Sequence, residues 1–290
     1  MIISILLVSA ACAAALAFGA VRWRIDAQAL RAQLTRAGRP LSCQTIDFAE
    51  LNGLPPPVQR YFRTVLKEGR TMVVGAQVRH EGHFNLGRSR WLPFRSRQQL
   101  VTHRPGFDWD ARIRMLPGLT VYVHDAYVAG EGVLHASLLG LLTVARMEGN
   151  RDIAAGELMR FLAEAAWYPT ALLPSQGVRW QAVDDRSALA TFSDGTLAVT
   201  LRFGFDGEGL IETIEADARG RAEGKTIVAM PWLGRFWNYQ WRDGMRVPLN
   251  GEAAWRLPTG VHPYWRGRIC AIDYQFAQPV PKSDTIALQT

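Results

Sequence analysis

The sequence has few cysteines and very little lysine. Its 290 residues include three Cys, at positions 12, 43 and 270, and no Cys-x-x-Cys pair. The usual zinc-ribbon and thioredoxin-like motifs are therefore excluded. Cys12 lies in an apolar N-terminal segment, so at most one disulfide bond, Cys43–Cys270, can form within the chain. Arginine carries nearly all of the positive charge, because only three of the 33 basic residues are Lys.

The sequence also lacks a complete catalytic or nucleotide-binding motif. It contains neither a full G-x-S-x-G elbow nor a phosphate-binding loop. His80 and His83 are three residues apart on a predicted strand, so their rings should point to opposite faces and share no metal. The net charge of +7 comes without a zinc finger, an RNA-binding signature or a recognition helix. We therefore expect no metal, no cofactor and no nucleic acid partner.

An uncharged segment opens the chain. Ile2–Val21 has 20 residues without a charge and would span roughly 30 Å as a helix, the thickness of a bilayer core. No polar stripe interrupts it, which favours a membrane span, residues 1–22, over a buried helix. The basic n-region of a secretory signal is missing. A retained single-pass anchor is therefore expected, with cleavage near Ala17 as the alternative.

The residues after the span, 23–46, are predicted to form a basic amphipathic helix and a linker. Ile25, Ala29, Leu30 and Leu34 would share one side of this helix. Arginines concentrate here, and the positive-inside rule then places the body in the cytoplasm. Long domains translocate with less regard for flanking charge, so the side of the membrane stays open.

The remaining chain, residues 47–277, reads as one antiparallel β domain followed by a tail at 278–290. Helices are expected near 56–67 and 152–167, where apolar residues recur every three or four positions. Elsewhere apolar and polar residues alternate, as in 197–205 and 245–257, which is typical of strands with one buried face. Ten to twelve strands result. The predicted fold class is α+β, mainly antiparallel β, with a large, curved, half-barrel-like sheet packed on one or two helices.

Two polar groups are candidates for chemistry. Asp108 and Asp110 share one face of a predicted strand, and they either form a solvated face or act as a carboxylate pair. Glu157, Arg160 and Glu164 lie on the side of the 152–167 helix opposite its apolar stripe. An exposed ion-pair series is the simpler interpretation. If the helix instead plugs the curved sheet, the same three side chains would form a buried polar cluster.

Aromatic side chains are abundant, with ten Trp in the chain. Several lie beside Pro or Arg near predicted strand ends, and they either plug the core or line the mouth of an apolar ligand site. The candidate ligand-binding residues are Trp91, Phe94, Trp109, Trp167, Tyr168, Trp232, Trp237 and Trp265.

Several of these segments resemble a family of bacterial proteins whose function has not been characterised, often with an N-terminal membrane segment. The matching motifs are Arg90–Phe94, Pro105–Trp109, Gly156–Arg160, Trp167–Pro174 and Pro263–Arg268. The resemblance covers about residues 47–276 and implies no activity and no catalytic residue. In layout, the chain is also similar to the half-barrel of periplasmic lipoprotein-sorting carriers, which hold acyl chains between a curved sheet and its helices.

These observations favour a membrane-anchored, non-enzymatic binder of a lipid or another hydrophobic ligand. A hydrolase-type enzyme is the first alternative, and it would use Glu157, Arg160 and Glu164 or the Asp108/Asp110 pair. An envelope interaction or scaffold module without a small-molecule site is the second.

Overall fold

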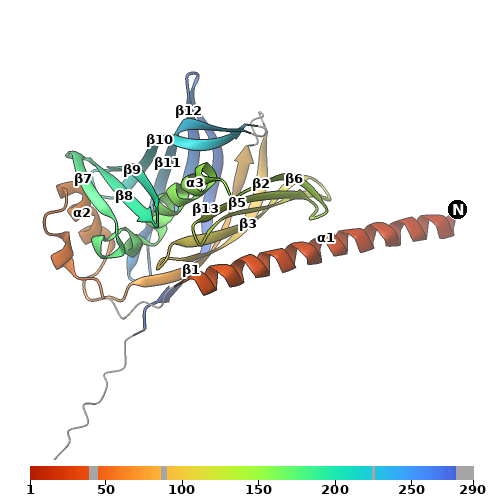
Figure 1. Ribbon diagram of the computed structural model, residues 1–290, viewed down its shortest axis with the longest axis horizontal. Helices are drawn as coiled ribbons and strands as arrows, with labels where there is room; N and C mark the ends of the chain where they lie inside the picture. The colour runs from red at the N-terminus through yellow and green to blue at the C-terminus, as the bar shows by residue number, and fades with distance from the viewer. Residues whose placement is uncertain (39–44, 86–89, 224–225, 279–290) are drawn as a thin grey trace, which may run out of the picture.

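The computed structural model describes residues 1–38, 45–85, 90–223 and 226–278 (Figure 1). Cys43, one half of the possible bridge, lies outside these residues, as does nearly all of the tail. The described strands number thirteen and form one antiparallel sheet. They are β1 (Val73–Asn85), β2 (Trp91–Val101), β3 (Gly106–Leu116), β4 (Leu119–Val128), β5 (Glu131–Leu138), β6 (Leu142–Glu148), β7 (Arg179–Asp184), β8 (Ser187–Asp194), β9 (Leu197–Phe205), β10 (Ile211–Glu223), β11 (Thr226–Arg242), β12 (Met245–Leu257) and β13 (Gly260–Phe276).

The strand order places the two ends of the domain at the middle of the sheet. It runs β6-β5-β4-β3-β2-β1-β13-β12-β11-β10-β9-β8-β7. The strands at the two edges, β6 and β7, are consecutive in the chain, so the segment between them must cross the sheet. That segment contains α3 (Arg151–Glu164) and the short 3-10 helices η2 (Ala165–Trp167), η3 (Pro169–Leu172) and η4 (Pro174–Gln176). The two wings of the sheet curve around α3, which defines an inner and an outer face (Figure 1). The predicted curved antiparallel sheet is confirmed.

Local sequence explains both domain helices. α2 (Pro56–Val65) begins with proline at its first turn and buries Val58, Tyr61 and Phe62. α3 begins after Asn150, whose side chain accepts a hydrogen bond from the Asp152 amide at 2.7 Å. Its Leu158, Phe161 and Leu162 enter the same core as α2. A short 3-10 helix, η1 (Phe48–Leu51), precedes α2.

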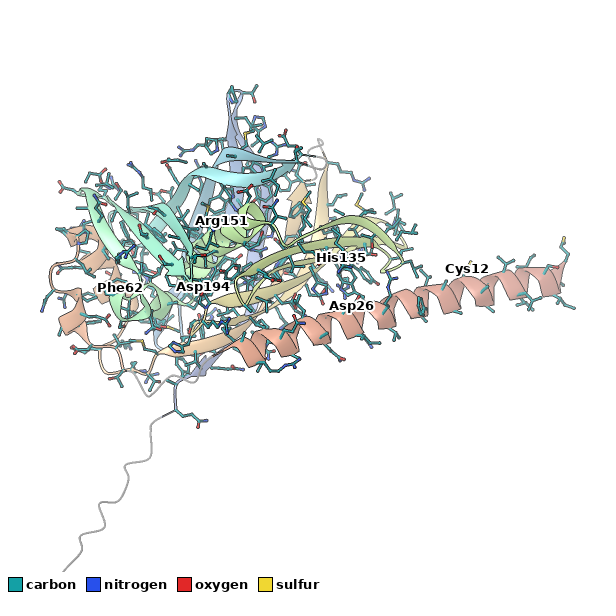
Figure 2. The ribbon with its side chains drawn as sticks, in the orientation of Figure 1. Cys12, Asp26, Phe62, His135, Arg151 and Asp194 are labelled. Atoms are coloured by element: carbon teal, nitrogen blue, oxygen red, sulfur yellow. The ribbon has the colours of Figure 1, made fainter. Side chains whose placement is uncertain are left out.

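The N-terminal helix α1 is one continuous helix, Ile2–Ala37, which includes the residues predicted to form a separate juxtamembrane helix. Its first half projects away from the domain, and Figure 2 shows Cys12 on this projecting part. From Gly19 onward the helix lies on the outer face of β2, β3 and β4. The buried stripe is Trp23, Ala27 and Leu34, whereas Ile25, predicted to share one side of the helix with Leu34, is exposed.

Polar contacts also hold α1 against the sheet. The Arg31 guanidinium pairs with Asp108 at 2.8 Å and with Asp110 at 3.3 Å. The Trp23 indole donates to Asp110 at 3.0 Å and stacks on His124, with ring centroids 4.5 Å apart. A single cation thus bridges two carboxylates that would otherwise repel each other under the helix.

Candidate functional site

A narrow cleft of about 110 Å³ lies between α3 and the inner face of the sheet. Strands from both wings contribute to it, because α3 crosses from one wing to the other. Four of the aromatic residues predicted to bind a ligand line this cleft: Trp109, Trp167, Trp232 and Trp265. Phe84, Phe236 and Tyr264 extend the aromatic wall.

Charged side chains form one end of the cleft. The Arg160 guanidinium pairs with Glu164 at 2.7 Å and with Asp125. It also lies over the rings of Phe107 and Trp109, about 5 Å from each centroid. Burial acts to lower the pKa of Arg160, but the carboxylates of Glu164 and Asp125 raise it above its ordinary value. Arg160 therefore stays charged and orients both acids.

A second cation lies nearby on β10. Arg219 donates to the Gly156 carbonyl at 3.2 Å and to the Tyr264 hydroxyl at 3.1 Å. The Trp232 indole donates to the same hydroxyl at 3.0 Å. The nearest acid is Glu157, 3.9 Å from the Arg219 guanidinium.

The charge on Glu157 determines the net charge of this cluster. Two guanidinium groups face three carboxyl groups: Asp125, Glu157 and Glu164. Burial, reinforced by the charge of Asp125, raises the pKa of Glu157 well above its usual range. A raised pKa lowers the negative charge that Glu157 adds to the cluster, which brings the three carboxyl groups closer to balance with the two guanidinium groups.

The cleft also holds hydrogen-bond donors that the described protein atoms leave unpaired. The indole N–H groups of Trp109 and Trp167 are buried without a partner among the described residues. Buried donors normally have a partner, so a ligand with acceptor oxygens would satisfy them. Aromatic walls with a few unpaired donors suit a molecule that has an apolar body and a polar end.

The structure does not place Glu157, Arg160 and Glu164 where the simpler interpretation of the sequence placed them. Glu157 and Glu164 are buried and Arg160 is mostly so, which shows that an exposed ion-pair series was wrong. The alternative in which α3 plugs the sheet explains this, because the sheet covers both sides of the helix.

The structure distributes the other predicted residues among three places. Phe94 packs inside against Trp109 and Trp265, behind the cleft wall. Tyr168 is fully buried and donates to the Phe161 carbonyl at 2.7 Å, so it belongs to the core. Trp91 and Trp237 contribute to the outer face, where Trp91 lies under the Arg266 guanidinium.

The Asp108/Asp110 pair lies under α1 rather than in a cleft. Phe107 and Trp109 point inward as strand parity requires, but the opposite face is not solvated, because Asp108 is completely buried. Its second oxygen is hydrogen-bonded to His124 Nδ1 at 2.8 Å. With Arg31 in place, both acids serve to fix the helix.

Several residues of the cleft were not anticipated. Asp125 lies between the inward-facing Val123 and Tyr127, so the parity of β4 would have marked it as an inward charge. Gln98, which donates to Glu164 at 2.5 Å, could have been found in the same way on β2. Arg219 could not, because a bulge between Ala216 and Arg219 changes the parity of β10.

Two solved structures are similar to this chain. A LolA superfamily protein from Nitrosomonas europaea is 9% identical, with a TM-score of 0.39, over 78% of this chain and 93% of that one. A beta-barrel-like protein of domain of unknown function DUF1849 from Brucella abortus is 10% identical, with a TM-score of 0.21, over 71% and 99%. The strand order described above, rather than these two likenesses, establishes the fold.

No curated protein matches the sequence. A family model does match, over residues 52–274, which is most of the chain and contains both domain helices and every described strand except the last two residues of β13. This agrees with the resemblance that the sequence motifs indicated. The chain belongs to the family of unknown function DUF6920.

Proposed function

We propose that this protein is a membrane-anchored, non-enzymatic binder of a lipid or another hydrophobic molecule with a polar end. The supporting observation is the cleft itself, where four Trp rings and two unpaired indole N–H groups adjoin a cluster of paired charges. The polar end would lie against Trp109, Trp167 and Arg219, and the apolar part against the aromatic wall.

The size of the cleft limits what enters in this conformation. Small-molecule sites usually measure about 300–1,000 Å³, whereas this cleft measures about 110 Å³. It therefore admits the end of a ligand, and a longer chain requires α3 to move away from the sheet.

Native mass spectrometry of the full chain, extracted in mild detergent, tests this proposal. We expect a co-purifying ligand, identified after organic extraction. Ala163 lines the cleft and is buried on α3, so Ala163→Leu should fill the space and reduce the bound fraction several-fold. Ala155→Leu adds the same group to a half-buried position of α3 outside the cleft and should retain the ligand. No bound mass in the wild type, or equal retention in both variants, would contradict the proposal.

A hydrolase is the second candidate, and Glu157 supports it. Burial raises the pKa of this carboxyl group, which is the direction that a general acid requires, and its Oε2 has no partner among the described residues. Glu157→Gln separates the two candidates, because it should abolish hydrolysis of an ester probe yet leave ligand retention unchanged.

The anchor is proposed to hold the domain directly on the bilayer. The first half of α1 is long and apolar enough to span a membrane. Where it ends, Gly19 lies so close to the β5–β6 turn that an added Cβ would be 2.5 Å from the Leu139 carbonyl oxygen. The Arg22 guanidinium donates to the Gly140 carbonyl at 2.7 Å in that turn.

The adjoining hairpin tips are apolar and exposed. Leu142 is 65% exposed, Val144 59% and Leu116, at the β3–β4 tip, 51%. The Leu139 amide donates to Thr120, which places the two tips side by side. In Figure 1 the β5–β6 hairpin points in the direction in which α1 projects. These side chains should therefore enter the interfacial region of the bilayer beside the span.

A fluorescent label measures this placement. We expect an environment-sensitive dye at Leu142→Cys, with the native cysteines replaced by Ser, to show blue-shifted emission in lipid nanodiscs and quenching by nitroxide-bearing lipids. A label at Val261→Cys is the control, because Val261 is 46% exposed at the distant β12–β13 tip. Equal quenching at the two positions would disprove the placement.

A further inference from the structure

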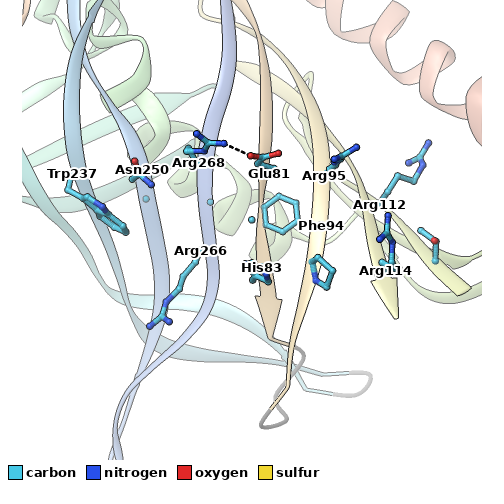
Figure 3. Close-up of a pocket in the computed structure, with 15 residues that line it drawn as sticks. Glu81, His83, Phe94, Arg95, Arg112, Arg114, Trp237, Asn250, Arg266 and Arg268 are labelled. Atoms are coloured by element: carbon cyan, nitrogen blue, oxygen red, sulfur yellow. Dashed lines mark hydrogen bonds and ion pairs between the residues drawn. The ribbon is translucent and has the colours of Figure 1, made fainter. Parts of the chain in front are cut away.

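The outer face of the sheet carries a larger hollow, of about 550 Å³, which the proposed function does not use. Figure 3 shows it across β13, β1, β2 and β3, with arginines on both sides. The five arginines that line this arginine groove are Arg95, Arg112, Arg114, Arg266 and Arg268. Glu81 is the only carboxylate among the described lining residues.

The register of the strands places like charges opposite each other in this groove. Arg95 on β2 lies between Glu81 on β1 and Arg112 on β3, and farther along the sheet Arg79 lies opposite Arg97. Like charges directly across a pair of strands destabilise a sheet. An anion bound between Arg95 and Arg112 would reduce the repulsion between them.

Three of the five guanidinium groups are held by neighbouring side chains. Arg268 pairs with Glu81, as the dashed line in Figure 3 shows, and Arg266 pairs with Glu252 at 2.6 Å. Arg112 pairs with Asp110 and stacks on Tyr122, 4.1 Å from the ring centroid. The positions of these three groups are therefore fixed before any ligand arrives.

Arg95 and Arg114 differ from the other three. Neither makes a hydrogen bond or an ion pair within 4.0 Å to any residue that the structure describes. Arg114 has no charged partner among the described residues, and Arg95 is attracted only at longer range by Glu81, which also pairs with Arg268, so positive charge is in excess at the side of the groove next to α1. A guanidinium presents paired N–H donors that match the oxygens of a phosphate.

We propose that the arginine groove binds a phosphate-bearing group, with Arg95 and Arg114 as its principal ligands. The volume falls within the range of small-molecule sites, and Trp237 and Asn250 supply an apolar and an amide contact on the opposite side. The phosphate can belong to a free molecule or to a phospholipid headgroup. Arg112 lies 5.7 Å from the ring of Trp23, two residues beyond the apolar span, so the groove begins close to the bilayer surface.

Chemical modification of the full chain in nanodiscs tests the site and separates the two sources. Phenylglyoxal labelling of each arginine is followed by peptide mass spectrometry, in neutral phosphatidylcholine or with added phosphatidylglycerol, each with and without inorganic phosphate. Slower labelling of Arg95 and Arg114 with inorganic phosphate in both bilayers identifies a free ligand. Slower labelling with phosphatidylglycerol alone identifies a headgroup. Arg202, exposed on β9, is the internal reference, and no protection, or equal protection of Arg202, overturns the proposal.

A pair of double variants separates a built site from net charge. Arg95→Gln/Arg114→Gln should weaken the binding of whichever phosphate source protects the site at least tenfold. Arg179→Gln/Arg202→Gln removes the same charge from exposed positions of β7 and β9 and should leave it unchanged. Equal losses in both variants would show that net charge alone is responsible.

Discussion

Replacing Arg160 with methionine should destabilise the folded domain by about 3–5 kcal/mol, because it breaks a buried ion pair and leaves its partners unpaired. Asp125 and Glu164 both depend on this guanidinium. Without it, two carboxylates remain close together in a cleft walled by aromatic rings. Urea unfolding of the full chain, followed by near-ultraviolet circular dichroism, measures the loss.

Two controls identify the origin of this effect. Adding Asp125→Asn and Glu164→Gln to Arg160→Met removes the orphaned charges and should restore most of the lost stability. Arg146→Met breaks a pair whose side chains are 58% and 53% exposed, so it should change stability by less than about 1 kcal/mol. A loss below about 1 kcal/mol for Arg160→Met would mean that water already screens the cluster.

The main elements of the fold could be predicted because they leave local signals. The alternation in 197–205 and 245–257 marked β9 and β12, and the apolar stripe Val58, Tyr61 and Phe62 marked α2. β6 and β7 are more difficult to recognise, because most of their residues are exposed on both faces. The strand order has no local signature at all, since it depends on β1 pairing with β13 some 190 residues along the chain.

The position of a residue in the candidate site could be predicted only where it depends on a single strand or helix. Strand parity correctly separated His80, which is buried inside, from His83, which lines the outer groove. It also separated His124 from Asp125. The partners of these residues come from other elements: Asp125 meets Arg160 of α3, and Asp108 meets Arg31 of α1. The sequence of a strand gives the face of a side chain but not which helix covers that face.

Below pH 6.5 the domain should lose stability through His80. This ring is buried against Trp167, and burial, together with the charge of Arg160, lowers its pKa from 6.5 to about 3. In the unfolded chain the same ring takes up a proton as the pH falls through 6.5. The unfolded state therefore binds more protons between pH 6.5 and about 3, and each pH unit costs about 1.4 kcal/mol.

Glu157 acts in the opposite direction, so the two contributions must be measured separately. Its raised pKa means that the folded state holds the extra proton, and that contribution is present at low pH and is lost as the pH rises. The difference in unfolding free energy between wild type and His80→Gln isolates the histidine, and it should shift by about 2.3 kcal/mol between pH 6.5 and 4.5 in favour of the variant. The difference for Glu157→Gln should change with the opposite sign, favouring the variant at high pH. His262→Gln, at an exposed position, should show little of either trend. Slopes of equal sign for His80 and Glu157 would contradict the burial of one of these two side chains.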